Sequence, residues 1–362
     1  MLDDDEYEKI LNQTIIPEKL SETERASQYS GIASFINSNI PPYLYRFRPF
    51  TEKSLKALDK DEIWFASAQL MNDDFDARPY FNKEAMNEWI DSFFDSSGIL
   101  HALQHISNMN NVPASIESHI PNIREGLHYL QNLPSQDIAL LSERLHKTLN
   151  ENINEITQDI SSMIQSSTKI ACFTEQIESD MMWGIYASNA TGFALEYDFK
   201  QNIITQTNND LNYPCKSANI LCTLFPVHYG QSRIDATAYV TYLYQSYLLY
   251  SAGLNNPDGW FSSFLPCPDL FMSKKIALYK STDWAPEKEW RLFFDTDCTS
   301  MSNAQYVKIN YKPHVIYLGR KCNEISQKII TNIALEKDIP VYKMTIDPSA
   351  NNYTLHAECI SE

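Results

Sequence analysis

The sequence predicts an α+β fold, and three observations support this class. Short aromatic and apolar runs typical of strands are interspersed with helical segments, and residues 83–168 form a long stretch with helical spacing. The 362 residues, 43% hydrophobic and 21% charged, suffice for one large domain with insertions or for two smaller ones. We expect a helical extension over residues 1–40 and a single α+β domain over residues 41–362, with a helical insertion at about 83–168.

The first part of the chain contains short elements with local signals. Residues 1–40 predict one or two polar helices and a linker, which Pro41-Pro42 ends. Thr51 is the expected N-cap of the following short helix, whose Leu55 and Leu58 face inward. The expected elements are a strand at 43–48, a helix at 51–59, a strand at 62–67 and a loop at 71–76.

The insertion carries an apolar stripe with helical periodicity. Its members recur every three or four residues: Ile138, Leu141, Leu145, Leu149, Ile153, Ile156, Ile160 and Ile164. We expect three or four helices here, with the stripe as the core of a bundle. The alternative is that the stripe forms a face for a partner protein.

The rest of the chain mixes strands and helices. Apolar and aromatic runs predict strands, and helical spacing predicts helices between them. Strands are expected at 169–174, 192–197, 225–230, 288–294, 314–318, 340–345 and 353–357, and helices at 180–187, 233–251, 268–280 and 323–336.

Charge and glycine usage exclude several classes of function. The formal net charge is −17, which argues against a broad phosphate-neutralising surface for nucleic acid. The chain has nine glycines, no two separated by a single residue and none before a lysine. A standard dinucleotide-binding glycine loop and a Walker phosphate loop are therefore excluded, so any nucleotide site must be built from side chains.

Cysteine usage and the absence of targeting signals predict a reduced, cytoplasmic protein. The seven cysteines include no C-x-x-C, which argues against a disulfide framework or a cysteine-based zinc site. The acidic start is unlike a signal peptide, and no stretch approaches the roughly 20 apolar residues of a transmembrane helix. We expect neither a metal nor a membrane partner.

Two arginines on the first strand are suited to binding an anion. Arg46 and Arg48 lie two residues apart, so they project to one face of the strand. Their planar guanidinium groups fit a phosphate bidentately. The plainer interpretation is a surface pair on an edge strand.

A hydroxyl residue and two aromatic residues form a second candidate segment. Thr174 ends a predicted strand, and the next helix carries Trp183 and Tyr186 three residues apart on one face. These rings can stack on a flat ligand ring, or they can belong to an aromatic core.

Two carboxylates at the start of a late strand form the third. Glu287 and Glu289 lie two apart, so on a strand they share a face, and their repulsion is expected to raise the pKa of one. Such a pair can stabilise a developing cation and accept a proton. Alternatively, this is a solvated strand end with Glu289 paired to Arg291 or another cation.

Four blocks of the chain resemble, in order, the bacterial family called domain of unknown function 2971. They are Tyr45-Arg46-Phe47-Arg48; Ile63-Trp64-Phe65-Ala66-Ser67 with Asn72-Asp73-Asp74-Phe75-Asp76; Cys172-Phe173-Thr174-Glu175 with Met182-Trp183-Gly184-Ile185-Tyr186-Ala187 and Gly192; and Trp284-Ala285-Pro286-Glu287-Lys288-Glu289-Trp290-Arg291. The resemblance covers about residues 43–80, 169–200 and 275–335. Asp74 and Thr174 stand where the family usually has Pro and Ser, and the family's function is unassigned.

The same residues are similar in order and spacing to the Arg–Ser–Glu class of ADP-ribosyltransferases, although Phe-Thr-Glu replaces the Ser-Thr-Ser that the class prefers. That resemblance implies two small β-sheets with flanking helices around a cleft for NAD, the substrate. The implied catalytic residues are Glu289, which binds the ribose and stabilises its cation, Glu287, which orients or deprotonates the acceptor, and Thr174, which supports the catalytic glutamate. The implied NAD-binding residues are Arg46, Arg48, Trp183, Tyr186, Ser67 and Asn72.

The resemblance implies an NAD-dependent ADP-ribosyltransferase or NAD glycohydrolase, acting as a bacterial toxin or phage-defence effector on a protein, a nucleic-acid base or water. One alternative is a non-catalytic interaction or sensor subunit of a defence or toxin–antitoxin system, with the helical insertion binding a partner. Another is a nuclease whose Asp73, Asp74 and Asp76 bind a divalent metal. An open cleft lined by Arg46, Thr174, Tyr186 and Glu289 favours the enzyme, whereas a buried Arg–Glu contact without a cavity favours the interaction subunit.

Overall fold

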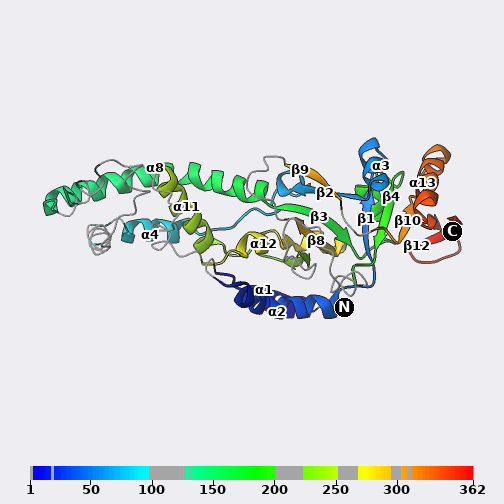
Figure 1. Cartoon of the computed structure of the whole chain (residues 1–362), viewed down its shortest axis with the longest axis horizontal. Coiled ribbons are helices and arrows are strands. Elements are labelled where there is room, and N and C mark those ends of the chain that lie inside the picture. The colour runs from blue at the N-terminus through cyan, green and yellow to red at the C-terminus, as the bar shows by residue number, and fades with distance from the viewer. Residues whose placement is uncertain are drawn as a thin grey trace.

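The computed structural model describes residues 3–17, 20–93, 132–200, 223–251, 268–294, 303–308 and 312–361, with a few single residues between 95 and 129. It confirms a mixed α+β architecture, with strands gathered on one side and long helices extending to the other (Figure 1). The strands are β1 (Leu44–Arg48), β2 (Glu62–Ser67), β3 (Lys169–Thr174), β4 (Phe193–Tyr197), β5 (Leu224–Pro226), β6 (His228–Gly230), β7 (Tyr279–Ser281), β8 (Glu289–Phe294), β9 (Ala304–Lys308), β10 (Val315–Leu318), β11 (Val341–Ile346) and β12 (Leu355–Ser361).

The helices flank these strands on several sides. They are α1 (Asp4–Gln13), α2 (Glu22–Asn39), α3 (Glu52–Asp59), α4 (Lys83–Phe93), α8 (Ser135–Ser167), α9 (Asp180–Tyr186), α11 (Thr237–Ser251), α12 (Met272–Ile276) and α13 (Glu324–Lys337). Two 3₁₀ turns, η1 (Ala68–Leu70) and η4 (Thr282–Glu287), lie next to strands. None of the described helices combines the length and the apolar character that crossing a membrane requires.

The large sheet forks at β3. On one edge, β3 pairs with β8 along its whole length, from Lys169 to Thr174. The opposite edge is shared, because β2 pairs with it at Lys169 and Ile170 while β1 pairs with it at Thr174. Strands β1 and β2 therefore diverge along β3, and in Figure 1 β1 and β4 run across the direction of β2 and β3.

The fork divides a single sheet of ten strands into two halves. One half has the order β12-β11-β10-β4-β1, and the other contains β9, β2, β3, β8 and β5. A separate two-stranded sheet is formed by β6 and β7. The two small sheets expected from the sequence are thus corrected to one continuous forked sheet and one short ribbon.

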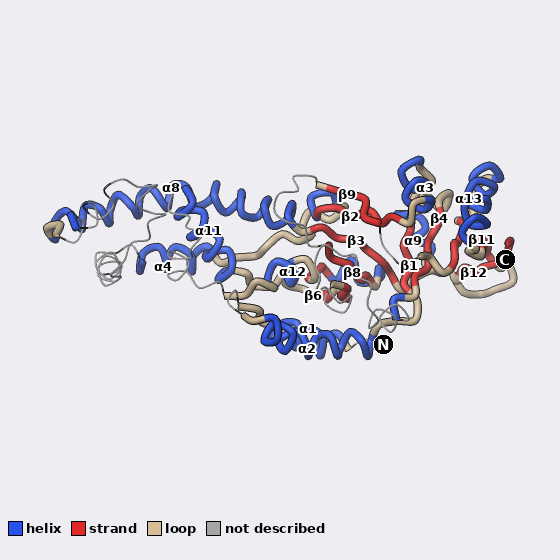
Figure 2. The backbone as a smooth tube through the Cα atoms, viewed as in Figure 1, coloured by secondary structure: helices blue, strands red, loops and turns tan. Residues whose placement is uncertain are grey.

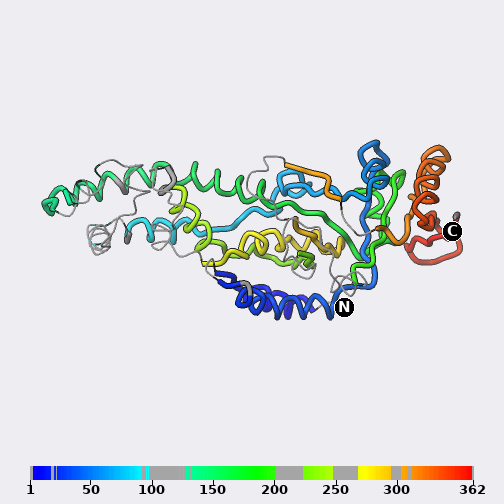
Figure 3. The backbone as a smooth tube through the Cα atoms, in the orientation of Figure 1, coloured from blue at the N-terminus to red at the C-terminus, as the bar shows by residue number. Residues whose placement is uncertain are grey.

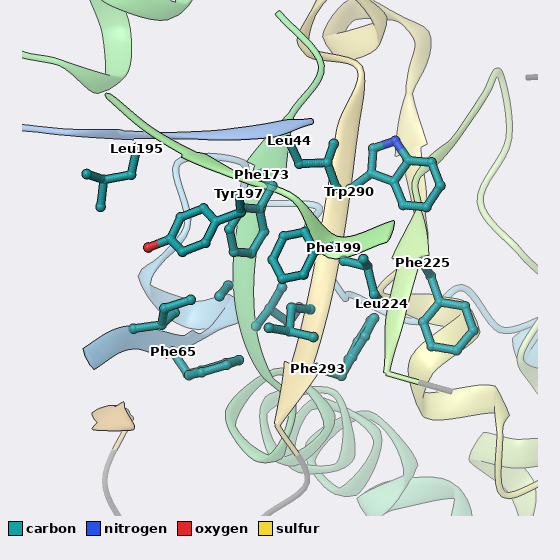
Figure 4. Close-up of a cluster of buried hydrophobic side chains, with 14 of the residues drawn as sticks. Leu44, Phe65, Phe173, Leu195, Tyr197, Phe199, Leu224, Phe225, Trp290 and Phe293 are labelled. Carbon is teal, nitrogen blue, oxygen red and sulfur yellow. The ribbon is translucent and has the colours of Figure 1, made fainter. Parts of the chain in front are cut away.

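An aromatic cluster packs against the fork. Phe173 of β3 meets Tyr197 and Phe199 edge to face, with ring centroids 5.5 and 5.0 Å apart. Figure 4 shows these rings together with Trp290 and Phe293 of β8. All five side chains are buried, and burial of each such ring contributes about 1.5–3 kcal/mol.

The N-terminal helices contribute to this main core. Tyr7 and Leu11 of α1 are fully buried, and the Tyr7 hydroxyl donates to the Pro226 carbonyl over 2.8 Å. The Ile16 amide donates to Asp269 Oδ1 over 2.9 Å, which fixes the end of this segment. The expected helices at 1–40 are therefore present, and they pack on the strands rather than standing apart.

Helices α4, α8 and α11 form an arm that extends away from the strands (Figure 2). The stripe along α8 is buried at Ile153, Ile156, Ile160 and Ile164, which confirms it as a bundle core at these positions. The described part of 83–168 holds α4 and one 33-residue helix, α8, and the segment between them lies mostly outside the described residues.

The third helix of the arm comes from much later in the chain. Figure 3 shows α11 beside α8, although α11 belongs to a different part of the sequence. Val240 and Tyr244 of α11 are fully buried in the arm, and the Tyr244 hydroxyl donates to the Leu149 carbonyl over 3.5 Å.

Two expected elements differ from the structure, and one strand was not expected. The strand at 225–230 is two strands, because β5 ends at Pro226, which has no amide hydrogen, and the chain then switches sheets. The helix expected at 268–280 is limited to α12, and Tyr279–Ser281 instead pairs with β6 as strand β7. Strand β9 is the unexpected one, and it pairs with β2 along its whole length.

We predict opposite effects of two glycine substitutions. A Cβ at Gly192 would lie 2.2 Å from the Arg48 carbonyl oxygen, so Gly192→Ala should destabilise the fold by about 1–3 kcal/mol. Exposed Gly31 in α2 has nothing within 4 Å of such a Cβ, so Gly31→Ala should stabilise by up to about 1 kcal/mol. Urea unfolding measures both, and equal effects would contradict the packing at Gly192.

Candidate active site

A cavity of about 310 Å³ lies at the fork of the sheet, between β1 and β2 and over β3. It lies within the size range of small-molecule sites. Seven of the nine residues predicted for the site line it: Arg46, Arg48, Asn72, Thr174, Tyr186, Glu287 and Glu289. These residues come from segments far apart in the sequence, so the fork is what brings them together.

The two glutamates reach the cavity by a local backbone feature that the sequence did not indicate. Glu287 is the last residue of η4 rather than part of a strand, and Glu289 is the first residue of β8. Lys288 between them has a left-handed conformation, with φ of 42°. The two glutamates therefore do not share one strand face, which the spacing of two would give on a strand, yet both line the same cavity.

A lysine bridges the two carboxylates. Lys280 of β7 is buried, and its Nζ lies 2.6 Å from Glu287 Oε2 and 3.0 Å from Glu289 Oε2. Its ammonium also lies 4.7 Å from the centre of the Trp284 ring. Burial lowers the pKa of Lys280, but Glu289 and Glu287 outweigh this and raise it, so the ammonium stays charged.

A buried arginine, Arg291, also binds Glu289. Arg291 has no exposed surface, and it donates from Nε to Glu289 Oε1 over 2.9 Å and from Nη2 to Glu289 Oε2 over 3.0 Å. The same guanidinium binds Asp76 through two bonds of 2.6 and 2.7 Å and donates to the Ala277 carbonyl. The bidentate geometry is the strongest form of such a pair.

Arg291 and Lys280 keep the carboxylate of Glu289 ionised. Burial raises the pKa of Glu289, but Arg291 and Lys280 outweigh burial and lower it to about 2. Repulsion within the glutamate pair therefore does not raise the pKa of Glu289, because Arg291 and Lys280 lie against its carboxylate. The expected pairing of Glu289 with Arg291 is confirmed, and it occurs beside a cavity rather than at a solvated strand end.

Hydroxyl groups orient Glu287. The Tyr186 hydroxyl donates to Glu287 Oε1, and Asn72 donates to the Tyr186 oxygen over 3.2 Å. Thr174 donates through Oγ1 to the backbone carbonyl of Glu287 and accepts from the Gln176 amide over 3.0 Å. Thr174 thus positions the turn that carries Glu287, and its hydroxyl bonds to that backbone rather than to the side chain of a glutamate.

The other wall of the cavity is cationic. Arg46 donates through Nη2 to the Trp64 carbonyl, and its guanidinium lies 5.5 Å from the Phe173 ring centre, while Arg48 lies 5.5 Å from the Trp64 ring. Burial and the neighbouring Arg48 lower the pKa of Arg46 to about 10, so it is charged at neutral pH. Among the described residues neither arginine has a carboxylate partner, and Arg46 Nη1 has no hydrogen-bond partner.

Two predicted site residues lie elsewhere. Trp183 is fully buried, donates through Nε1 to the Ile177 carbonyl over 2.8 Å and packs edge-on against Phe47, so it is a core residue. Ser67 is fully buried where β2 meets β3, and the cavity is lined by its neighbour Ala66 instead.

The acidic loop has structural roles. Asp76 is bound to Arg291, and Asp73 accepts the Phe75 amide over 2.9 Å, while Asp74 is exposed. The described residues contain no group of three His, Cys, Asp or Glu side chains arranged to hold a metal ion. Asp73, Asp74 and Asp76 therefore do not converge on a cation site.

Residues 182–292 match the model of the family described as "Protein of unknown function (DUF2971)". The chain is similar to that family over this segment, which runs from α9 to β8 and includes Tyr186, Lys280 and both glutamates. The arginines of β1 lie outside the matched residues. No curated protein and no solved structure matches the chain.

We predict that Arg291→Met destabilises the protein by about 3–5 kcal/mol, because it leaves Asp76 and Glu289 buried without their partner. The control is Lys337→Met, which removes the more exposed pair with Asp61 and should cost at most about 1 kcal/mol. Urea unfolding of both variants at neutral pH gives the comparison. Similar small losses for both would show that the buried pair does not hold the site together.

Acid should weaken the fold through Glu289. Its pKa of about 2 lies below its usual value of 4.5, so the ionised carboxylate contributes stability that is complete above pH 4.5 and is lost as the pH falls towards 2. One such proton contributes a slope of up to about 1.4 kcal/mol per pH unit. Urea unfolding across this range should show a shallower pH dependence in Glu289→Gln than in the wild type.

Proposed function

We propose that the protein cleaves the nicotinamide–ribose bond of NAD and transfers the ADP-ribose to an acceptor or to water. The observation that carries this proposal is that one cavity combines a pair of carboxylates with two arginines that have no carboxylate partner within the described part of the chain. Thr174 of β3 pairs in register with Tyr45 of β1 on one edge and with Glu289 of β8 on the other. Arg46, the neighbour of Tyr45, and Glu289 therefore come from strands on either side of β3. An anionic ligand with a sugar at one end matches this distribution of charge.

Arg46 and Arg48 would bind the pyrophosphate. Arg46 is buried and Arg48 is partly buried in a protein whose net charge is −17, so they form a local attraction for anions that the bulk of the molecule lacks. A phosphate oxygen would supply the missing partner for Arg46 Nη1. The aromatic rings of Phe173 and Trp64 hold the guanidinium groups in place from the side.

Glu289 would act on the ribose next to the bond that breaks. Since Glu289 is ionised, it can stabilise the positive charge that develops on the ribose as the carbon–nitrogen bond opens. The electron pair of that bond leaves with nicotinamide. The anomeric carbon then bonds to the acceptor atom, which loses its proton.

Glu287 would receive that proton. It accepts one hydrogen bond from Tyr186 and one from Lys280, which leaves further acceptor sites on its oxygens. It can therefore orient an acceptor hydroxyl, amine or water and remove its proton. In this proposal Thr174 holds the backbone of Glu287, and Asn72 holds Tyr186.

The second candidate is a non-catalytic interaction subunit. It is favoured by the burial of Glu289 and by its pairing with Arg291, which alone would also be found in a structural cluster. The adjoining cavity, lined by Arg46, Thr174, Tyr186 and Glu289, favours the enzyme.

We predict that Glu289→Gln lowers NAD turnover roughly 10²–10⁴-fold, because it removes the charge that faces the developing cation. The assay combines the protein with labelled NAD and cell lysate and measures released nicotinamide and labelled macromolecules. The control is Glu196→Gln, which changes another buried glutamate, one that accepts the Tyr317 hydroxyl over 2.7 Å outside the cavity. A wild-type protein that neither binds nor consumes NAD would refute the enzymatic proposal.

A further inference from the structure

The short ribbon of β6 and β7 presents two different faces. Its parallel register pairs His228 with Tyr279 and Tyr229 with Lys280. Because side chains alternate along a strand, the first pair lies on one face and the second pair on the other. The contacts of these four residues show that one face is turned to the cavity and the other to helix α1.

The cavity face of the ribbon contacts both glutamates. The Glu289 amide donates to the Tyr229 hydroxyl oxygen over 2.8 Å, so Tyr229 holds the first residue of β8. Lys280 binds both Glu287 and Glu289 through its single ammonium group. A lysine ammonium has three donors on a flexible stem, which allows it to serve two carboxylates at once.

The opposite face rests on α1. His228 Nδ1 lies 3.1 Å from Asp4 Oδ1, and the Tyr279 hydroxyl donates to Asn12 Oδ1 over 3.1 Å and to Glu8 Oε1 over 3.3 Å. Figure 2 shows α1 beneath β6. Helix α1 is itself fixed to the core by buried side chains, so it forms a firm support behind the ribbon.

We infer that Lys280 and Tyr229 are positioning residues for the glutamate pair, carried by a ribbon that helix α1 holds in place from behind. Two ionised carboxylates in one buried site repel each other, and a cation shared between them offsets the repulsion. Lys280 thus keeps Glu287 and Glu289 close together and helps to keep Glu289 ionised, while Tyr229 fixes the backbone where β8 begins. The effect on turnover rests on the proposed function, whereas the effect on the carboxylates does not.

The test replaces Lys280 by methionine, which keeps the length of the side chain and removes its charge. Under the proposed function, nicotinamide release should fall about 100-fold, the loss expected when reacting groups shift by about 1 Å. The acidic limb of its pH profile should move up by about 1–2 pH units, because Glu289 loses one of its two cations. Among the described residues, the ionisable groups that face Glu289 are Arg291, Lys280, Glu287, Asp76, Cys172, Tyr229 and Tyr186.

A measurement without NAD tests the positioning role separately. In urea unfolding, Lys280→Met should weaken the loss of stability between pH 4.5 and 2, because Glu289 is then protonated nearer to its usual value of 4.5. The double variant Lys280→Met/Glu287→Gln also removes the repulsion between the two carboxylates. It should therefore recover part of the wild-type acid profile, which is the loss of stability between pH 4.5 and 2. Lys337→Met, which breaks a remote pair, should match the wild type in both assays.

The outcomes separate the two proposals. A wild-type protein that does not turn over NAD refutes the proposed function, and the acid profile then decides the positioning role alone. An acid profile of Lys280→Met that equals the wild type overturns the positioning role, even where turnover falls. If Lys280→Met does not fold, Tyr229→Phe is the second variant, and unchanged turnover and an unchanged acid profile in it overturn the role of the ribbon.

Discussion

The structure depends on one guanidinium group that has no contact with solvent. Arg291 binds Asp76 from the loop after β2, Glu289 from its own strand and the Ala277 carbonyl before β7. A buried charge without partners costs several kcal/mol, so these three segments must stay together for the chain to fold. The helical arm contacts the same loop, because Gln165 of α8 donates to the Asp76 carbonyl over 2.9 Å. The site is thus built on the contact that holds the sheet, the ribbon and the arm together.

The fork of the sheet opens a cavity next to Glu289, the carboxylate that Arg291 binds. Because β1 and β2 share one edge of β3 and diverge, a space opens at the middle of the strand, where a regular sheet would have continuous pairing. Two arginines with no carboxylate partner among the residues that the structure describes lie on one wall, while carboxylates paired with Lys280 and Arg291 lie on the other. This separation of charge in a small volume is unusual for a purely structural cluster, since buried charges are normally paired. It is the physical reason for preferring an anionic ligand, and an enzyme, over an interaction subunit.

Local sequence signals predicted much of the fold but little of the site's charge network. The helix after Thr51 and strand β3 follow from capping and patterning within a few residues. The fork, the β6–β7 ribbon and the joining of α11 to the arm depend on contacts between distant segments, which periodicity does not encode. Lys280 was missed for that reason, because its strand forms only by pairing with β6. Trp183 was assigned to the site on its spacing from Tyr186, yet the helix turns it into the core.

The most direct measurement is a crystal structure of the protein with a non-hydrolysable NAD analogue. The account predicts the pyrophosphate against Arg46 and Arg48, and the nicotinamide ribose beside Glu289, with Lys280 still bridging the two glutamates. An analogue bound in the reverse direction, or bound away from the fork, would contradict the assigned roles. A structure in which the cavity takes up no analogue at concentrations that saturate NAD-consuming enzymes would contradict the account as a whole.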